Sequence, residues 1–114
     1  MLDYFGEPIS VYTEQQGVED GILMETPSVL FPECDLITTN LWNYFEEKVK
    51  NCPLTEPIDL LNVIMLNASI IYDKGKFKGD NDRNFFVIKC HNLKDIWFCR
   101  NGNNKLTAML PEDY

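Results

Sequence analysis

Few side chains in this sequence are suited to catalysis, because it contains a single histidine, His91, and four cysteines. Nucleophilic catalysis needs a base close to a Ser, Thr or Cys side chain. Cys90 adjoins His91, but consecutive residues of a strand point to opposite faces, which keeps the two apart. Cys99 lies in a β-rich, apolar run, and we interpret both cysteines as structural. We therefore predict no catalytic residues and no enzyme activity; the competing enzyme hypothesis depends on His91 and Asp82.

Patterns for metals and cofactors are also weak. The four cysteines are separated by 18, 38 and 9 positions, so no C-x-x-C pair is present. Residues 80–84, "DNDRN", alternate oxygen-bearing side chains as a calcium loop does, but His91 stands where the closing glutamate belongs. The six glycines are scattered and form no phosphate-binding loop. We expect no metal site and no cofactor.

Charge is the strongest chemical signal in the sequence. The net charge is −8, and no basic residue precedes Lys48. Residues 1–57 contain eleven acidic residues and two lysines, whereas residues 58–114 contain seven acidic and eight basic residues. An acidic surface repels nucleic acid and anionic lipid and attracts basic protein surfaces. Solubility alone is the simpler explanation, since small domains are routinely kept soluble by such a charge.

We call residues 1–57 the front half. If its acidic residues lie on one surface, that surface could bind a partner. Duplex DNA presents one charge per ~1.7 Å of axis, and a row of carboxylates can imitate that pattern towards a basic cleft. Such a protein inhibits a nucleic-acid-binding partner by occupying its cleft and does not bind nucleic acid itself. The candidate partner-binding residues are Glu14, Glu19, Asp20, Glu25, Glu46 and Glu47.

A basic loop in the second half suggests an alternative function. Four cations surround one aromatic side chain in this loop, an arrangement that can hold a phosphate or a base. The residues are Lys74, Lys76, Phe77, Lys78 and Arg83. The alternative is therefore a small-ligand binding module that sequesters a nucleotide signal through residues 74–83. A solvated loop that complements the acidic half would show the same composition.

Three helices are expected to position these residues. A T-x-x-Q capping box at Thr13 predicts a short helix over 14–20, after a strand around residues 9–12. An apolar stripe predicts a second helix over 40–51, capped by Thr38 or Thr39. The residues between, "PSVLFPECDL", read as an irregular connection because two prolines interrupt them.

The third predicted helix, residues 57–73, is apolar nearly all round. It begins at Pro57, with Thr55 as candidate cap, and ends before Gly75. Leu66 interrupts its only polar strip. Such a helix is either the central element of the domain, which we favour, or is covered on a second side by another subunit in a homodimer.

Three β-rich runs after residue 84 predict a meander, its last two strands joined by a type I′ turn at Asn101-Gly102. The predicted fold is α+β, with three helices packed on a three- to four-stranded antiparallel sheet in the order β-α-α-α-β-β-β. At 114 residues the chain fits one domain, residues 1–114. No signal peptide and no apolar run near ~20 residues is present, so we predict a cytoplasmic protein that contacts no membrane.

Four segments together resemble one protein family. They are "FGEPISVYTEQQGVEDGILMET", "LITTNLWNYF", "IDLLNVIMLNAS" and "LTAMLPEDY". In order and spacing they are similar to small uncharacterised bacterial, plasmid and phage proteins that share an F-G-x-x-I-x-x-Y-T-x-x-Q-x-x-x-D-G-x-L opening and an M-L-P-E-D terminus. The resemblance implies no enzyme activity and a mobile-element setting, where small acidic proteins often inhibit host defence. The expected partner is then a CRISPR effector nuclease or another defence protein in the host cytosol.

Overall fold

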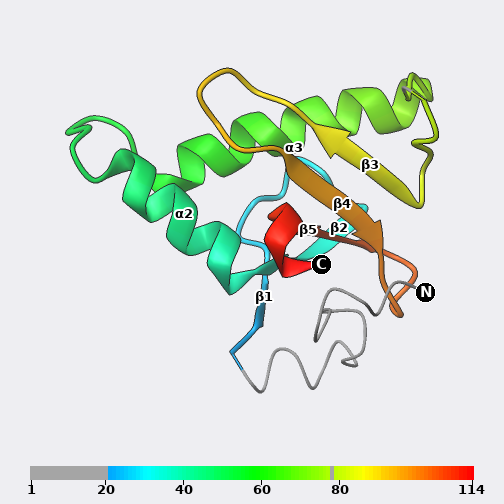
Figure 1. Ribbon diagram of the computed structural model, residues 1–114, viewed down its shortest axis with the longest axis horizontal. Coiled ribbons are helices and arrows are strands. Elements are labelled where there is room, and N and C mark those ends of the chain that lie inside the picture. Colours follow the sequence, from blue (N-terminus) through cyan, green and yellow to red (C-terminus); the bar gives the residue numbers. More distant parts are fainter. Residues whose placement is uncertain (1–20, 78) are drawn as a thin grey trace.

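The structure is a computed structural model that describes residues 21–77 and 79–114 (Figure 1). Its elements are β1 (Leu23–Glu25), β2 (Cys34–Thr38), α2 (Thr39–Val49), α3 (Pro57–Lys74), β3 (Phe85–Ile88), β4 (Ile96–Arg100), β5 (Leu106–Met109) and the 3₁₀-helix η2 (Pro111–Asp113). The strand predicted around residues 9–12 and the helix predicted over 14–20 lie outside the described residues.

The sheet differs from the predicted one. Five strands lie in the order β1-β2-β5-β4-β3, with β2 parallel to β5 and all other pairs antiparallel. Two α-helices, α2 and α3, accompany it in the part of the chain that is described. The α+β class holds, but three helices on a three- to four-stranded antiparallel sheet is wrong. The described order is β-β-α-α-β-β-β.

Strand β2 is the element that the sequence failed to reveal. It occupies residues that we expected to belong largely to an irregular connection, and it lies inside the sheet between β1 and β5. Leu36 and Ile37 are neighbours that point to opposite faces, yet both are buried. A strand covered on both faces shows no alternation of polar and apolar residues, so its period cannot be recognised.

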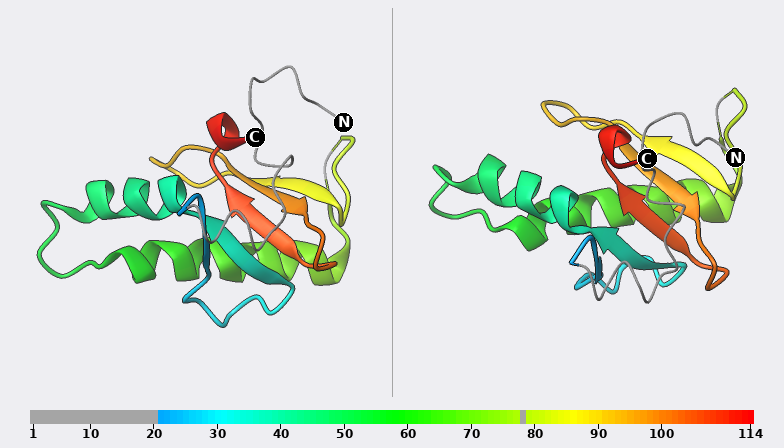
Figure 2. Two further views of the ribbon diagram at one scale, coloured as in Figure 1. Left: turned by 90° about the horizontal axis from the view of Figure 1, so that it is seen from below. Right: turned by 60° about the horizontal axis from the view of Figure 1, so that its bottom comes forward.

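Both helices pack on the same face of the sheet (Figure 2). Phe45 of α2 and Leu61 of α3 are fully buried against it. Below them, Phe86 and Phe98 stack with ring centroids 5.0 Å apart, and Phe31 meets the Phe98 ring edge-on at 5.9 Å. This aromatic cluster joins the β1–β2 connection to β3 and β4, so the core holds together segments far apart in the chain.

The helix ends follow local chemistry. Thr38, one of the two predicted candidates, is the N-cap of α2, and its hydroxyl accepts from the Leu41 amide at 3.2 Å. Helix α3 begins at Pro57 as predicted, but the cap is Glu56 rather than Thr55. The reason is that the Asp59 carboxylate accepts from the Glu56 amide at 2.8 Å.

The end of α3 and the last hairpin both depend on left-handed residues. Gly75 ends α3 with φ +65°, as its sequence position predicted. In the β4–β5 hairpin the left-handed residue is Asn104, with φ 60°, and Gly102 does not have a positive φ. The predicted type I′ turn at Asn101-Gly102 is therefore wrong, because the loop is longer. The Asn104 amide donates to the Asn101 carbonyl at 3.1 Å, a three-residue loop closed by a left-handed residue.

Candidate functional site

The predicted acidic residues that are described all reach solvent. Glu46 and Glu47 lie on the outward side of α2, and Glu25 ends β1, an edge strand. None of the three carboxylates forms a hydrogen bond or ion pair with any described residue. Their charge is therefore not neutralised within that part of the molecule. Glu14, Glu19 and Asp20 lie outside the described residues.

The structure brings Glu46 and Glu47 together but not with Glu25. Glu25 pairs with Leu36, two residues before the cap of α2. Glu46 stands seven residues into the helix from Thr39, ~10 Å along its axis at 1.5 Å per residue. The α2 pair is also followed by Lys48 and Lys50, which are exposed. The described acidic residues thus form separate patches rather than one continuous row.

The helical hairpin carries the Glu46–Glu47 pair away from the sheet. In Figures 1 and 2 the turn between α2 and α3 extends beyond the strands, as a projecting tip. Leu54 lies in this turn and is 96% exposed. In the sequence Leu54 lies between the charged residues Lys50 and Glu56. We call residues 46–56 the hairpin tip.

Two residues of the basic loop of the alternative function, Arg83 and Phe77, are committed to the fold. Arg83 donates from Nε and Nη2 to the Tyr72 carbonyl at 3.1 and 2.8 Å, and its guanidinium lies 5.2 Å from the Tyr72 ring centroid. It therefore satisfies the end of α3. The Phe77 ring packs on Phe86 at 5.3 Å. Lys74 and Lys76 are exposed, and Lys78 lies outside the described residues. These contacts give the nucleotide-binding alternative no support.

Arg100 adds a contact that sequence reasoning missed. Its Nη2 donates to the Tyr72 hydroxyl at 3.2 Å and to the Arg83 carbonyl at 2.8 Å. The Tyr72 ring thus has guanidinium groups of both Arg83 and Arg100 within 6 Å of its centroid. Arg100 is 28 residues from Tyr72 in the chain, so no local pattern predicts the pair.

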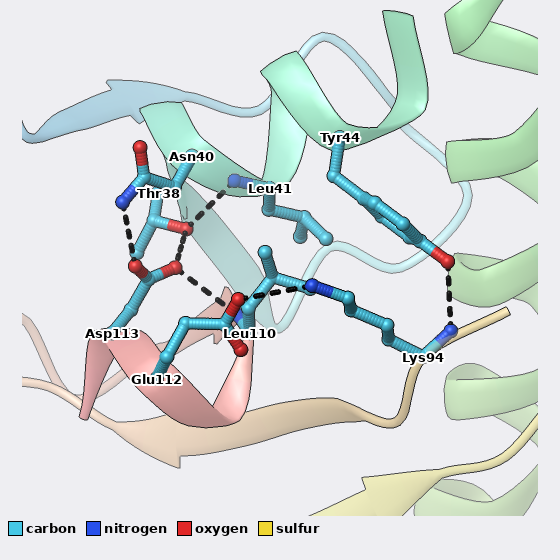
Figure 3. Close-up of polar contacts among 8 residues, drawn as sticks. All are labelled: Thr38, Asn40, Leu41, Tyr44, Lys94, Leu110, Glu112 and Asp113. Carbon is cyan, nitrogen blue, oxygen red and sulfur yellow. Dashed lines mark hydrogen bonds and ion pairs between the residues drawn. The ribbon is translucent and has the colours of Figure 1, made fainter. Parts of the chain in front are cut away.

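A polar cluster fixes the start of α2 against the C-terminal turn (Figure 3). The Asp113 carboxylate accepts from Thr38 Oγ1 at 2.7 Å, from Asn40 Nδ2 at 2.8 Å and from the Leu110 amide at 3.2 Å. A carboxylate at this helix end is also stabilised by the helix dipole. Two segments quoted for the family resemblance, "LITTNLWNYF" and "LTAMLPEDY", therefore meet here.

A second set of contacts ties the β3–β4 connection to the same region (Figure 3). The Lys94 amide donates to the Tyr44 hydroxyl at 2.8 Å, and Lys94 Nζ lies 3.2 Å from Glu112 Oε2. The pKa of the Glu112 carboxyl is held below its ordinary value, first by its own backbone amide and then by Lys94. The region is a structural clamp that orients α2, and with it the hairpin tip.

The cysteines differ sharply in reactivity. Burial raises the pKa of the Cys34 thiol and that of the Cys99 thiol to about 12 each, and it also raises the pKa of Cys90. Cys52, in the hairpin tip, is exposed. In residues 21–77 and 79–114 no three His, Cys, Asp or Glu side chains are grouped so as to hold a metal ion.

We expect an alkylating reagent to label Cys52 first at neutral pH and to reach Cys34 and Cys99 only after denaturation. Mass spectrometry of peptides from native and urea-treated protein measures this. Because the raised pKa keeps both thiols protonated in the folded state, their contribution to stability is complete below pH 9.0 and is lost as the pH rises towards about 12. Labelling of Cys34 as fast as Cys52 in native protein would contradict the burial described.

Helix α3 has an outward face, and the sequence did not show whether this face is covered within the domain. Leu61, Ile64, Met65 and Ala68 are buried against the sheet, as expected for a central helix. Val63, Leu66 and Ile70 point the other way and are 51%, 52% and 45% exposed. No described element covers them. An apolar patch that is left exposed on a surface is a candidate contact site.

The fold defines an α+β domain whose exposed features are a protruding helical hairpin, which carries Glu46 and Glu47, and an apolar helix face. Comparison with known proteins gives no match to a family model, a curated protein or a solved structure. Neither α2 nor α3 has the length and apolar composition needed to cross a membrane. The function is therefore inferred from the residues of the site.

Proposed function

We propose that this chain is a small, non-enzymatic inhibitor that binds a basic surface of a nucleic-acid-handling protein through acidic residues of its front half. The observation that supports it is that Glu25, Glu46 and Glu47 are exposed and have no charged or polar partner among the described residues. Residues 1–20 add five acidic residues and no basic one. The family resemblance favours a host defence partner, such as a CRISPR effector nuclease, met in the host cytosol.

The charges at such an interface affect the association rate and the selectivity of binding more than they affect the affinity. An exposed ion pair contributes ~0–1 kcal/mol, but complementary fields raise association rates and make them sensitive to salt. Affinity therefore requires an apolar anchor. Leu54 supplies one in the hairpin tip, where it lies near Glu47 and Glu56 in sequence and is 96% exposed.

Three of the four thiols are unsuited to nucleophilic catalysis. A thiolate, rather than a thiol, is the nucleophile in cysteine catalysis. The raised pKa of Cys34 and of Cys99 keeps both thiols protonated at neutral pH. Cys90, the neighbour of His91, also has a raised pKa. None of these three cysteines is activated as a nucleophile.

Charge reversal with a matched control tests the proposal. After capture of a basic partner from host lysate, association rates are measured at low and at physiological salt. We expect Glu46→Lys with Glu47→Lys to slow association about tenfold or more and to remove its salt dependence. The control, Asp73→Lys with Asp80→Lys, changes the same charge at two exposed residues, one in the last turn of α3 and one beyond it, and should stay within about twofold.

A third variant, Glu14→Lys with Glu19→Lys and Asp20→Lys, measures how much residues 1–20 contribute to the association rate. Equal effects of the tip variant and the control would show that only net charge matters and would reject a defined acidic site. Binding that is insensitive to all three variants, or capture of partners without a basic surface, would reject the function itself. Circular dichroism of each variant establishes that it is folded.

A further inference from the structure

Five exposed residues of α3 form one stripe along its outward face. Their spacing of four, three, four and four keeps them on the same side of a helix with 3.6 residues per turn. They are Asp59, Val63, Leu66, Ile70 and Lys74, which we call the outer stripe. The three central residues are apolar, one end is acidic and the other is basic. The buried residues of α3 lie on its opposite side, so the domain's own core does not use the stripe.

The order of residues along the outer stripe is self-complementary. Its midpoint falls between residues 66 and 67. Positions 59 and 74 are equally far from this midpoint, and so are positions 63 and 70. Two copies of α3 placed antiparallel therefore bring Asp59 opposite Lys74 and Val63 opposite Ile70. Leu66 then lies beside its own copy on the two-fold axis. Antiparallel helix dipoles also attract each other.

We propose that the outer stripe is the interface of a symmetric homodimer in which two α3 helices pack antiparallel. A two-fold interface requires that one surface complement itself, and the outer stripe does so in its order of charged and apolar residues. A parallel arrangement would instead place Asp59 against Asp59 and Lys74 against Lys74. This proposal is independent of the proposed inhibitory function, since the stripe is not part of the hairpin tip.

The neighbours of the stripe are compatible with this packing. The Asn67 amide donates to the Val63 carbonyl at 3.0 Å and lies 3.9 Å from Cys90 Sγ, so it is turned towards the sheet side. Leu66, rather than Asn67, therefore lies at the two-fold axis of the dimer. The Lys74 side chain makes no hydrogen bond or ion pair with any other described residue, so its charge is available for Asp59 of a second copy.

The dimer is expected to depend on concentration. A standard stable interface buries roughly 800 Å² per partner, and a single helix face supplies less than that. Dissociation constants in the micromolar range are therefore expected, and sedimentation velocity from about 1 to about 100 μM should follow the monomer–dimer equilibrium. Leu66→Glu should give a monomer throughout. Lys74→Glu should weaken the dimer about tenfold, whereas Lys76→Glu, exposed but outside the helix, should not.

Cysteine cross-linking tests the antiparallel register. In a Cys52→Ser background, which removes the exposed thiol, we expect Leu66→Cys to form a disulfide-linked dimer on mild oxidation. Asn43→Cys, also at an exposed position but on α2, is the control and should remain monomeric. Val63→Cys mixed with Ile70→Cys should cross-link faster than either variant alone.

Three outcomes would overturn the proposal. One is a monomer at every concentration; another is a Leu66→Cys variant that cross-links no faster than Asn43→Cys. The third is a parent chain that stays monomeric while Leu66→Glu abolishes capture of the basic partner. That result would assign the outer stripe to the partner rather than to a second copy.

Discussion

The Phe31→Ala variant is expected to lose about 3–5 kcal/mol of unfolding free energy, the largest effect of any single substitution proposed for this chain. Phe31 is 2% exposed, and its ring meets those of Tyr72, Phe86 and Phe98 at 5.4, 6.4 and 5.9 Å. Removing the ring leaves a cavity where α3, β3 and β4 converge. Domains of this size are stable by about 5–15 kcal/mol, so the loss approaches the whole stability of a marginal fold.

Val29→Ala is the matched control, two residues away in the same connection. Val29 is 83% exposed, so truncation should change the unfolding free energy by less than about 0.5 kcal/mol. Urea titration followed by tryptophan fluorescence measures both variants. If Phe31→Ala and Val29→Ala unfold at the same urea concentration, the connection before β2 is not anchored in the core as described.

Asp113→Ala is expected to cost about 2–3 kcal/mol. The carboxylate accepts three hydrogen bonds, from Thr38, Asn40 and the Leu110 amide, at 2.7, 2.8 and 3.2 Å. Hydrogen bonds to a charged group contribute ~1.5–3 kcal/mol, and a carboxylate at a helix N-terminus adds ~0.3–1 kcal/mol. Its loss also frees the C-terminal turn from α2, so the position of the hairpin tip should become less defined.

Glu112→Ala provides the comparison, because Glu112 is the adjacent residue of the same turn. Its partner is Lys94, and the two side chains are 56% and 53% exposed, so removal should cost less than about 1 kcal/mol. Asp113→Asn, which keeps the shape but loses charge and one acceptor, should fall between the two alanine variants. Thermal unfolding measures all three. Equal losses for Asp113→Ala and Glu112→Ala would show that the clamp depends on burial of the turn rather than on its hydrogen bonds.

Local patterns predicted the elements that depend on near neighbours. The α2 cap at Thr38, the α3 start at Pro57 and its end at Gly75 each follow from residues within one helical turn. The three strands after residue 84 were also predicted, because each alternates or clusters β-forming residues within a few positions. Capping, backbone conformation and period are short-range effects, and a sequence shows them directly.

Tertiary packing overruled the expectations that depended on distant segments. Strand β2 pairs in parallel with β5, about 70 positions later in the chain, and is buried on both faces, so it had no recognisable period. The alternative function placed Arg83 against a ligand, but packing placed it on the Tyr72 carbonyl at the end of α3. The basic composition of a loop gives its charge but does not show which backbone carbonyl its arginine will contact.

The sequence by itself determined the start of α2, the first residue and the end of α3, the last three strands, the acidic character of the front half and the scarcity of catalytic groups. Only the tertiary structure decided that β2 belongs to the sheet, that Thr38 and Asp113 meet across 75 positions, and that Val63, Leu66 and Ile70 remain uncovered. The physical reason is the separation along the chain over which each interaction acts. Backbone preferences act over a few residues, whereas burial and hydrogen bonding are settled by whichever distant groups the chain brings into contact.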